Sequence, residues 1–169
     1  MNDAARKRIK TAISISLSLF FLTACTGVNT MFRGNTVYQA DRIYITRDGA
    51  GGGVWSTDEL SVHYTYATRS GRINLTGYVA ISNSITATYS TLDRLSVFIS
   101  FLDADGRVLS TRDLDPVYFA HSPPLEKITF EKDMDLTGEA ASFCFSYSGE
   151  FRGDDKKWDS LSIGKTPFY

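Results

Sequence analysis

Two histidines, His63 and His121, are the residues of this chain best suited to acid–base catalysis near neutral pH. A serine hydrolase would also need a nucleophile on a sharp turn such as Gly-x-Ser-x-Gly, and the sequence contains no such motif. Neither histidine lies in a His-x-x-x-His or His-Glu pattern that would indicate a metal-dependent hydrolase. We therefore expect a chain that is not an enzyme, with a hydrolase whose site has no recognisable motif as the alternative.

Four aspartates, Asp103, Asp105, Asp113 and Asp115, could approach one another across a hairpin and attract calcium. An EF-hand loop needs oxygen ligands at alternate positions and a distant glutamate, and residues 103–106 supply only a fragment of that pattern. Aspartates that bond their own backbone in turns explain these residues without a metal. We expect no metal and no cofactor, and calcium-dependent carbohydrate binding is a further alternative.

The first 24 residues are typical of an export signal. Four basic residues lie within the first ten positions, and an apolar segment follows over residues 11–24. That segment is diluted by serine and threonine, and it is shorter than the roughly 20 residues of a stable spanning helix. Small residues then precede Cys25. The pattern predicts a helical signal peptide over residues 1–24 that is cleaved before Cys25.

The sequence Leu22-Thr23-Ala24-Cys25 resembles the lipobox of bacterial lipoproteins. The resemblance implies a diacylglyceryl thioether on Cys25, so that the membrane is the first partner of the mature chain. The next residue, Thr26, is not an aspartate. In a Gram-negative host this resemblance implies sorting to the outer membrane, facing the periplasm. We expect a location in the cell envelope, held by lipid.

Cleavage before Cys25 leaves 145 residues, enough for one domain with a sizeable core. The signal takes four basic residues and one acidic residue with it, so the net charge of the mature chain is −4. Nucleic-acid binding depends on clustered positive charge, which the mature chain does not have. The composition therefore excludes a nucleic-acid partner and leaves the acyl group as the expected membrane contact.

Alternation of apolar and polar residues predicts strands along most of the mature chain. Residues 60–66 and 73–81 alternate on either side of a short turn at 69–71, which predicts an antiparallel hairpin. Residues 95–101 and 107–111 predict a second hairpin around a turn that ends in Gly106. Further strands are expected at 37–46, 127–131 and 140–148. The fold class is therefore all-β, an antiparallel sandwich of about seven strands over residues 37–169.

Two segments are expected to lie outside the strands. Residues 25–36 are polar and contain glycine, which indicates a lipidated tether rather than packed structure. Residues 49–53 are a glycine cluster that predicts a flexible loop between strands. Cys144 lies between Phe143 and Phe145 in an apolar run, with Phe143, Phe145 and Tyr147 on one strand face and the thiol on the other. We interpret it as a buried core cysteine.

The segments Gly77–Ser84 and Leu95–Leu109 resemble the immunoglobulin-like FxLYD domains of bacterial envelope proteins. Those domains have a G-x-V-x-N-x start and an aliphatic strand that ends in aspartate before a glycine turn, here Asp103 and Gly106. At the namesake positions this chain has Ile99, Phe101 and Leu102 instead of Phe, Leu and Tyr. The resemblance implies an immunoglobulin-like sandwich outside the cytoplasm and no catalytic residues.

Aromatic residues are abundant, with nine Tyr, eleven Phe and two Trp. Most fall on alternating strand positions and are expected in the core. Trp55, Trp158, Phe168 and Tyr169 do not follow that alternation, which makes them candidates for a binding patch for a polysaccharide or a protein. The alternative is that they cap the open ends of the sandwich.

Together these observations predict a lipid-anchored, non-catalytic lipoprotein of the cell envelope that acts as a binding or accessory module. Its partner would be an envelope protein or a polysaccharide. Either an exposed aromatic patch or an unpaired edge strand would make the contact. An envelope hydrolase and a calcium-dependent carbohydrate-binding domain are the alternatives.

Overall fold

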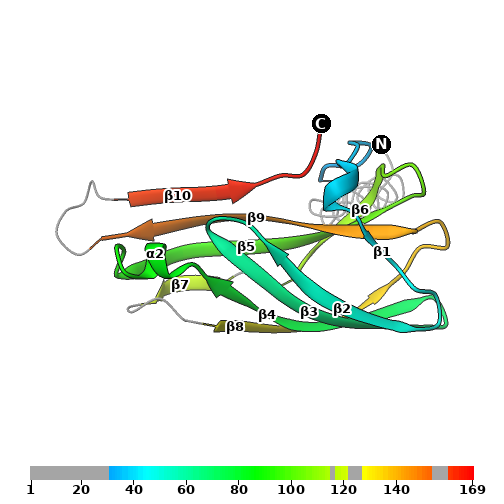
Figure 1. Cartoon of the computed structure of the whole chain (residues 1–169), viewed down its shortest axis with the longest axis horizontal. Coiled ribbons are helices and arrows are strands. Elements are labelled where there is room, and N and C mark those ends of the chain that lie inside the picture. The colour runs from blue at the N-terminus through cyan, green and yellow to red at the C-terminus, as the bar shows by residue number, and fades with distance from the viewer. Residues whose placement is uncertain (1–30, 115–116, 122–126, 154–159) are drawn as a thin grey trace, which may run out of the picture.

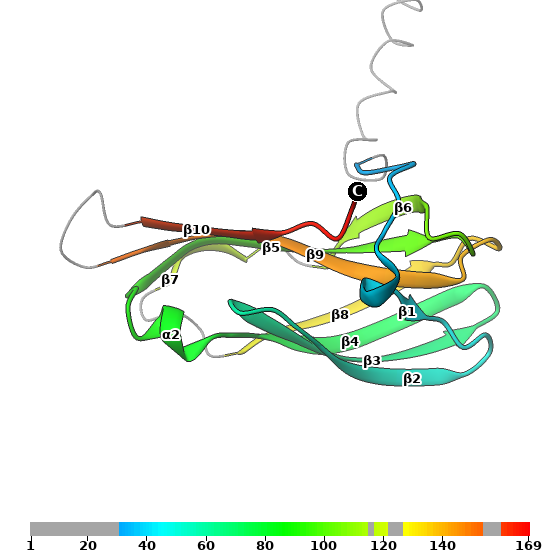
Figure 2. The same ribbon diagram turned by 45° about the horizontal axis from the view of Figure 1, so that its top comes forward.

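The computed structural model describes residues 31–114, 117–121, 127–153 and 160–169, which form two antiparallel sheets packed face to face (Figures 1 and 2). The strands are β1 (Ile43–Tyr44), β2 (Ala50–Ser56), β3 (Leu60–Arg69), β4 (Arg72–Ile81), β5 (Thr91–Leu102), β6 (Val108–Asp113), β7 (Val117–His121), β8 (Lys127–Asp135), β9 (Ser142–Arg152) and β10 (Ser160–Lys165). One sheet, which we call the β5/β9 sheet, has the order β1-β9-β5-β6, with β10 also paired to β9 and β7 to β5. The other, the β3/β4 sheet, has the order β2-β3-β4-β8. The predicted all-β sandwich is confirmed, with ten strands in the described residues instead of about seven.

The strand pairing is that of an immunoglobulin-like sandwich. In one sheet, β3, β4 and β8 pair in the manner of immunoglobulin strands A, B and E. In the other, β5, β9 and β10 pair in the manner of strands C, F and G. The chain therefore crosses between the sheets after β4 and again on either side of β8, as a Greek key requires.

Both predicted hairpins are present. Ser70 and Gly71 join β3 to β4 with φ of 52° and 75°, and two successive left-handed residues are what a type I′ turn needs. Between β5 and β6, Gly106 has φ of 85°. There the Asp103 carboxylate accepts a hydrogen bond from the Arg107 backbone N–H at 2.8 Å. Asp103 is thus a turn aspartate whose side chain bonds the backbone of the same turn.

The core lies between the sheets, because alternate residues of each strand face inward. Phe143, Phe145 and Tyr147 of β9 belong to this core, as the alternation predicted. Cys144 points to the other face of β9, where it is fully buried in a second, smaller cluster with Val37 and its neighbours. The prediction of a buried Cys144 is confirmed.

The prediction of a flexible loop at residues 49–53 is wrong, because most of that segment belongs to strand β2. Its register places Gly51 opposite Tyr66 and Gly53 opposite Tyr64. A Cβ atom added to Gly51 would lie 2.7 Å from the Tyr66 ring, so the ring occupies the space that a side chain would need. The glycines therefore make room for tyrosines of the neighbouring strand.

The N-terminal part of the domain also differs from expectation. Residues 31–36, expected in the tether, pack against β6: the Gly34 N–H donates to the Val108 carbonyl, and the Val108 N–H donates to the Asn35 carbonyl. The predicted first strand at 37–46 is reduced to β1 and an isolated bridge between Val37 and Phe168. Residues 31–38 thus pair with β6 and with the last residues of the chain instead of forming a free tether and one long strand.

Helical structure in the described ranges consists of a 3-10 turn at Gln39–Asp41 and helix α2 at Asn83–Thr86. No helix in these ranges has the length and hydropathy to cross a membrane. The predicted signal over residues 1–24, Cys25 and Trp158 lie outside the described residues. Predictions about them therefore stay predictions.

Candidate functional site

Strand β2 forms one edge of the β3/β4 sheet, and no strand of the described chain pairs with its outer side. It is seven residues long and has neither a charged residue nor a proline. Every residue except Trp55 is at least partly exposed. Such an edge presents unpaired N–H and C=O groups to any extended chain that approaches it. Strand β2 is therefore a candidate binding edge.

Strand β8, at the opposite edge of the same sheet, has a different composition. Five of its nine residues are charged, including Lys127, Glu131 and Asp133. Charged side chains along an edge discourage pairing with another chain. The β3/β4 sheet thus has one edge that is protected by charge and one, β2, that is not.

A shallow hollow of about 490 Å³ lies beside the β2 edge, on the outer face of the β3/β4 sheet. It is formed by small side chains and by the bare backbone of the glycines. Its lining residues are Ala50, Gly51, Gly52, Thr65, Tyr66, Ala67, Asn74 and Thr76. Thr65 and Thr76 share a hydrogen bond of 2.9 Å on this face. The hollow offers room for side chains of a strand added at β2.

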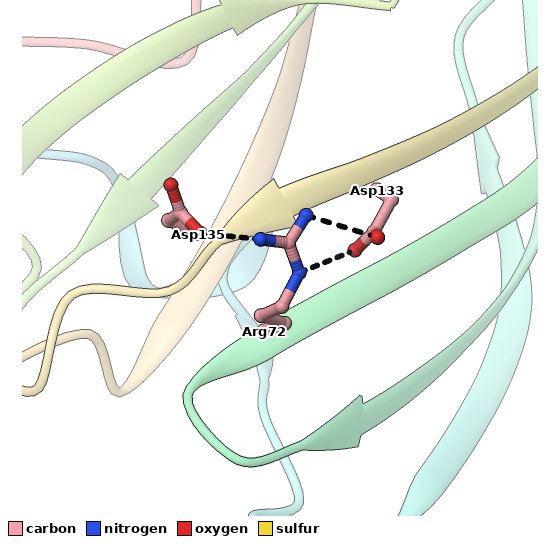
Figure 3. Close-up of polar contacts among 3 residues, drawn as sticks. All are labelled: Arg72, Asp133 and Asp135. Carbon is pink, nitrogen blue, oxygen red and sulfur yellow. Dashed lines mark hydrogen bonds and ion pairs between the residues drawn. The ribbon is translucent and has the colours of Figure 1, made fainter.

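A second hollow of about 350 Å³ continues the first, sharing Ala67 and Asn74, and it is lined at its far end by Arg72 and Asp133. The Arg72 guanidinium lies 2.9 Å from one Asp133 oxygen and 3.0 Å from Asp135 (Figure 3). The hydrogen bond from Arg72 and the negative charge of Asp133 raise the pKa of Arg72. This end of the face is therefore polar, with its arginine already paired to two carboxylates.

His63 and Tyr78 stack at the other end of the outer face, with ring centroids 4.4 Å apart. The Lys127 ammonium lies 4.9 Å from the centroid of the Tyr78 ring. His63 also lies in hydrogen-bond contact with Ser61, with 3.2 Å between the His63 Nε2 and the Ser61 Oγ. A serine in contact with a histidine is one element of a serine hydrolase site. A catalytic triad also needs a group that orients the imidazole and hydrogen-bond donors for the oxyanion. Ser61 and His63 lie on one strand of an open sheet face, so their contact alone does not make such a site.

The two histidines are not brought together on one element. His63 is on β3, whereas His121 ends β7 in the other sheet and pairs with Leu92 there. Within the described ranges, no group of three or more His, Cys, Asp or Glu side chains is arranged to hold a metal ion. Of the four aspartates considered for calcium, Asp103 makes its turn contact and Asp115 lies outside the described residues.

Trp55, one of the predicted binding residues, is in strand β2 and is 8% exposed. Its ring lies 5.8 Å from that of Phe145 and 6.0 Å from that of Tyr147, between the two sheets. The position alternates correctly with the exposed residues on either side, which is why the ring faces inward. Trp55 therefore belongs to the core and does not contribute to an exposed patch.

A polar cluster lies beside Trp55. The Tyr147 hydroxyl donates to the Glu59 carboxylate at 2.7 Å and shares a hydrogen bond of 2.9 Å with Thr57. The bond from Tyr147 is the largest cause of a lowered pKa at Glu59. Burial raises the pKa of Tyr147 to about 12. These contacts tie the β2–β3 loop of one sheet to β9 of the other.

Phe168 and Tyr169, two of the predicted binding residues, do come together with other aromatics. Phe168 lies 4.5 Å from Phe32 between ring centroids, and Tyr169 lies 4.7 Å from Tyr38. We call these four residues the terminal aromatic cluster. Phe32 and Phe168 pack on the buried group that contains Cys144, whereas Tyr38 and Tyr169 are exposed. The cluster therefore has a buried layer and an exposed layer.

The β2 edge and two members of this cluster, Phe32 and Tyr38, were not predicted from the sequence. A signal for the edge exists in the sequence, since Val54 and Trp55, two residue types that favour strands, follow the glycines in a run without charge or proline. For the cluster the signal was Met31-Phe32, an apolar pair in an otherwise polar segment. Comparisons with protein-family models, with curated proteins and with solved structures found no match for this chain.

Proposed function

We propose that this protein is a lipid-anchored, non-catalytic lipoprotein of the cell envelope that binds an extended segment of another envelope protein along strand β2. The signal-like first 24 residues and the Leu22–Cys25 sequence support the anchor. The observation that carries the binding role is the unpaired, uncharged edge of β2 beside a hollow. In a Gram-negative host the lipidated domain faces the periplasm from the outer membrane.

A peptide fits this site better than a polysaccharide. A peptide strand added to β2 gains backbone hydrogen bonds along the edge, and every second side chain of that strand lies on the face of the hollow. Sugars instead favour a free aromatic face. On the outer face of the β3/β4 sheet, the Tyr78 ring is stacked against His63 and lies next to Lys127, so it offers no such platform.

The test uses a photo-crosslinking amino acid at Val54, whose side chain is 56% exposed on β2. The matched control places the same amino acid at Thr129, an exposed position on the charged edge strand β8. In intact cells we expect one recurrent envelope protein to crosslink at position 54 and not at position 129. Equal adducts at both positions, or none at 54, would overturn the proposed edge.

A second variant and an anchor control complete the experiment. Val54→Lys places a charge on the edge without touching the core, so it should abolish recovery of the partner while the melting temperature is retained. Cys25→Ser should lose metabolic lipid labelling and membrane attachment. A Cys25→Ser protein that still carries lipid contradicts the anchor but not the binding edge.

The contact between Ser61 and His63 favours one alternative, an envelope hydrolase. A fluorophosphonate probe, which labels activated serines, distinguishes the two functions. We expect the wild-type protein to remain unlabelled, because among the described residues no carboxylate bonds to His63 to orient its imidazole as a triad requires. Labelling that disappears in Ser61→Ala would replace the non-catalytic proposal with the hydrolase.

A further inference from the structure

The first and last described residues lie together on the outer side of the β5/β9 sheet, away from the β3/β4 sheet (Figure 2). The Tyr38 N–H donates to the Pro167 carbonyl, and the Tyr169 N–H donates to the Thr36 carbonyl. These bonds flank the bridge between Val37 and Phe168. The two ends of the domain thus form one short paired ribbon, which holds the terminal aromatic cluster in place.

Three large apolar side chains of this region are exposed. Met31 is 40% exposed, Tyr38 52% and Tyr169 67%. They make up three of the five large apolar side chains with high exposure in the described chain, the others being Tyr44 and Val54. The Tyr38 and Tyr169 rings lie 4.7 Å apart between centroids, and Met31 adjoins Phe32 of the same cluster, which makes these side chains candidates for a contact site.

The position of this surface along the chain indicates what covers it. Met31 follows Cys25 by six steps along the chain. At roughly 3.3 Å per residue this length of chain reaches about 20 Å at most, so a lipid on Cys25 would hold Met31 within that distance of the bilayer. This step depends on the anchor in the proposed function. An exposed surface held that close to a lipidated residue is within reach of the lipid headgroups.

We propose that Met31, Tyr38 and Tyr169 form a membrane-facing surface that rests on phospholipid headgroups and orients the domain. Tyrosine suits that layer, because its ring is apolar and its hydroxyl remains hydrated. Arg33 and Arg107 are exposed on the adjoining segments, where their charges can meet lipid phosphates, and Asp105 on the neighbouring turn matches a headgroup amine. The lipid on Cys25 attaches the protein, and this surface determines which side of it faces the membrane.

The proposed orientation of the domain on the membrane leaves the β2 edge accessible. Because the surface lies on the outer side of the β5/β9 sheet, contact with lipid directs the β3/β4 sheet toward the aqueous side (Figure 2). Strand β2 and its hollow belong to that sheet. A partner could then reach β2 without competing with the membrane.

The test uses the lipidated mature protein in vesicles of phosphatidylethanolamine and phosphatidylglycerol. A fluorophore is attached to a single added cysteine, either Ala104→Cys on the β5–β6 turn or Thr129→Cys on β8. Cys144 does not compete for the label, because its thiol is fully buried. Lipids with a nitroxide on the headgroup quench only fluorophores close to the membrane surface. We expect quenching at position 104 and little at position 129.

The decisive comparison is the double variant Tyr38→Ser with Tyr169→Ser, with Val54→Ser as the matched control on the other sheet. The double variant should still float with the vesicles but lose the difference in quenching between the two labels, whereas the control should keep it. Equal quenching in the wild-type protein would overturn the proposal. A change from dimer to monomer in the double variant would also overturn it, since the surface would then join two copies. A wild-type protein that fails to float with the vesicles refutes the lipid anchor. Flotation thus tests the anchor, whereas quenching tests the orientation.

Discussion

Replacing Tyr147 by phenylalanine removes one hydroxyl and retains a buried ring of nearly the same shape. That hydroxyl is the donor to Glu59 at 2.7 Å and the partner of Thr57 at 2.9 Å. The ring remains packed beside Trp55. The substitution therefore isolates the polar contacts that join the β2–β3 loop to β9, with little change in hydrophobic burial.

The size of the effect follows from the type of bond. A hydrogen bond to a charged acceptor contributes about 1.5–3 kcal/mol. Glu59 is partly exposed, so water can replace part of the lost interaction. We expect Tyr147→Phe to lower the free energy of unfolding by about 1–2 kcal/mol at pH 7. For a domain of this size the melting temperature falls by about 3–6 °C.

The stability difference between wild type and Tyr147→Phe should depend on pH, because both Glu59 and Tyr147 titrate. The pKa of Glu59 is lowered in the folded state from its ordinary value of 4.5, so its stabilisation is present above that pH and is lost as the pH falls. The pKa of Tyr147 is raised from 10.0 to about 12, so the unfolded tyrosine ionises first and the wild-type protein loses stability between these values. The advantage of wild type over variant should therefore be largest between about pH 5 and 10.

Urea unfolding from pH 3 to pH 11, followed by tryptophan fluorescence, measures this advantage. Trp55 lies between the sheets and reports their separation. Glu59→Gln and the double variant complete a cycle in which the coupling between the two residues is obtained directly. A difference between wild type and Tyr147→Phe that stays constant across the whole pH range would refute the proposed hydrogen bond to an ionised Glu59.

Three further predictions concern the glycine strand, the buried thiol and the surface ion pairs. Gly51→Ala should cost about 1–3 kcal/mol of stability in chemical unfolding, because the new methyl group meets the Tyr66 ring, whereas Gly138→Ala, with no atom within 4 Å, should be nearly neutral. Cys144 should resist thiol reagents at pH 8 until the protein is unfolded, since burial raises its pKa to about 12; rapid labelling of folded protein would contradict this. Arg72→Ala should leave the melting temperature unchanged in low and high salt, because its ion pairs are exposed.

Strands in which apolar residues alternate regularly could be predicted from the sequence. The two hairpins and the inward face of β9 follow directly from this alternation, because a period of two fixes which side chains face the core. The turns at Gly106 and at Ser70–Gly71 could also be predicted, because these turns need a positive φ and glycine adopts it without strain. In these places local preference and tertiary structure agree.

The β2 edge could not be predicted in the same way. A run of three glycines has no side chains to alternate. It lies in a strand through its pairing with β3, where the Tyr64 and Tyr66 rings occupy the space beside Gly53 and Gly51. The terminal aromatic cluster depends on a pairing between residues 36–38 and 167–169, which are far apart in the sequence. Both parts of the candidate site thus arise from tertiary contacts.

Burial of Cys144 connects the terminal ribbon with the proposed location. An unpaired thiol is a liability in an oxidising compartment, where it can form disulfides with other proteins. Here Val37, Leu102 and Val108 bury the thiol completely, and Phe32 and Phe168 pack over that group from the two ends of the domain. Because a thiolate is the reactive species, a pKa of about 12 further suppresses exchange. The same ribbon that exposes Tyr38 and Tyr169 on one side therefore protects the cysteine on the other.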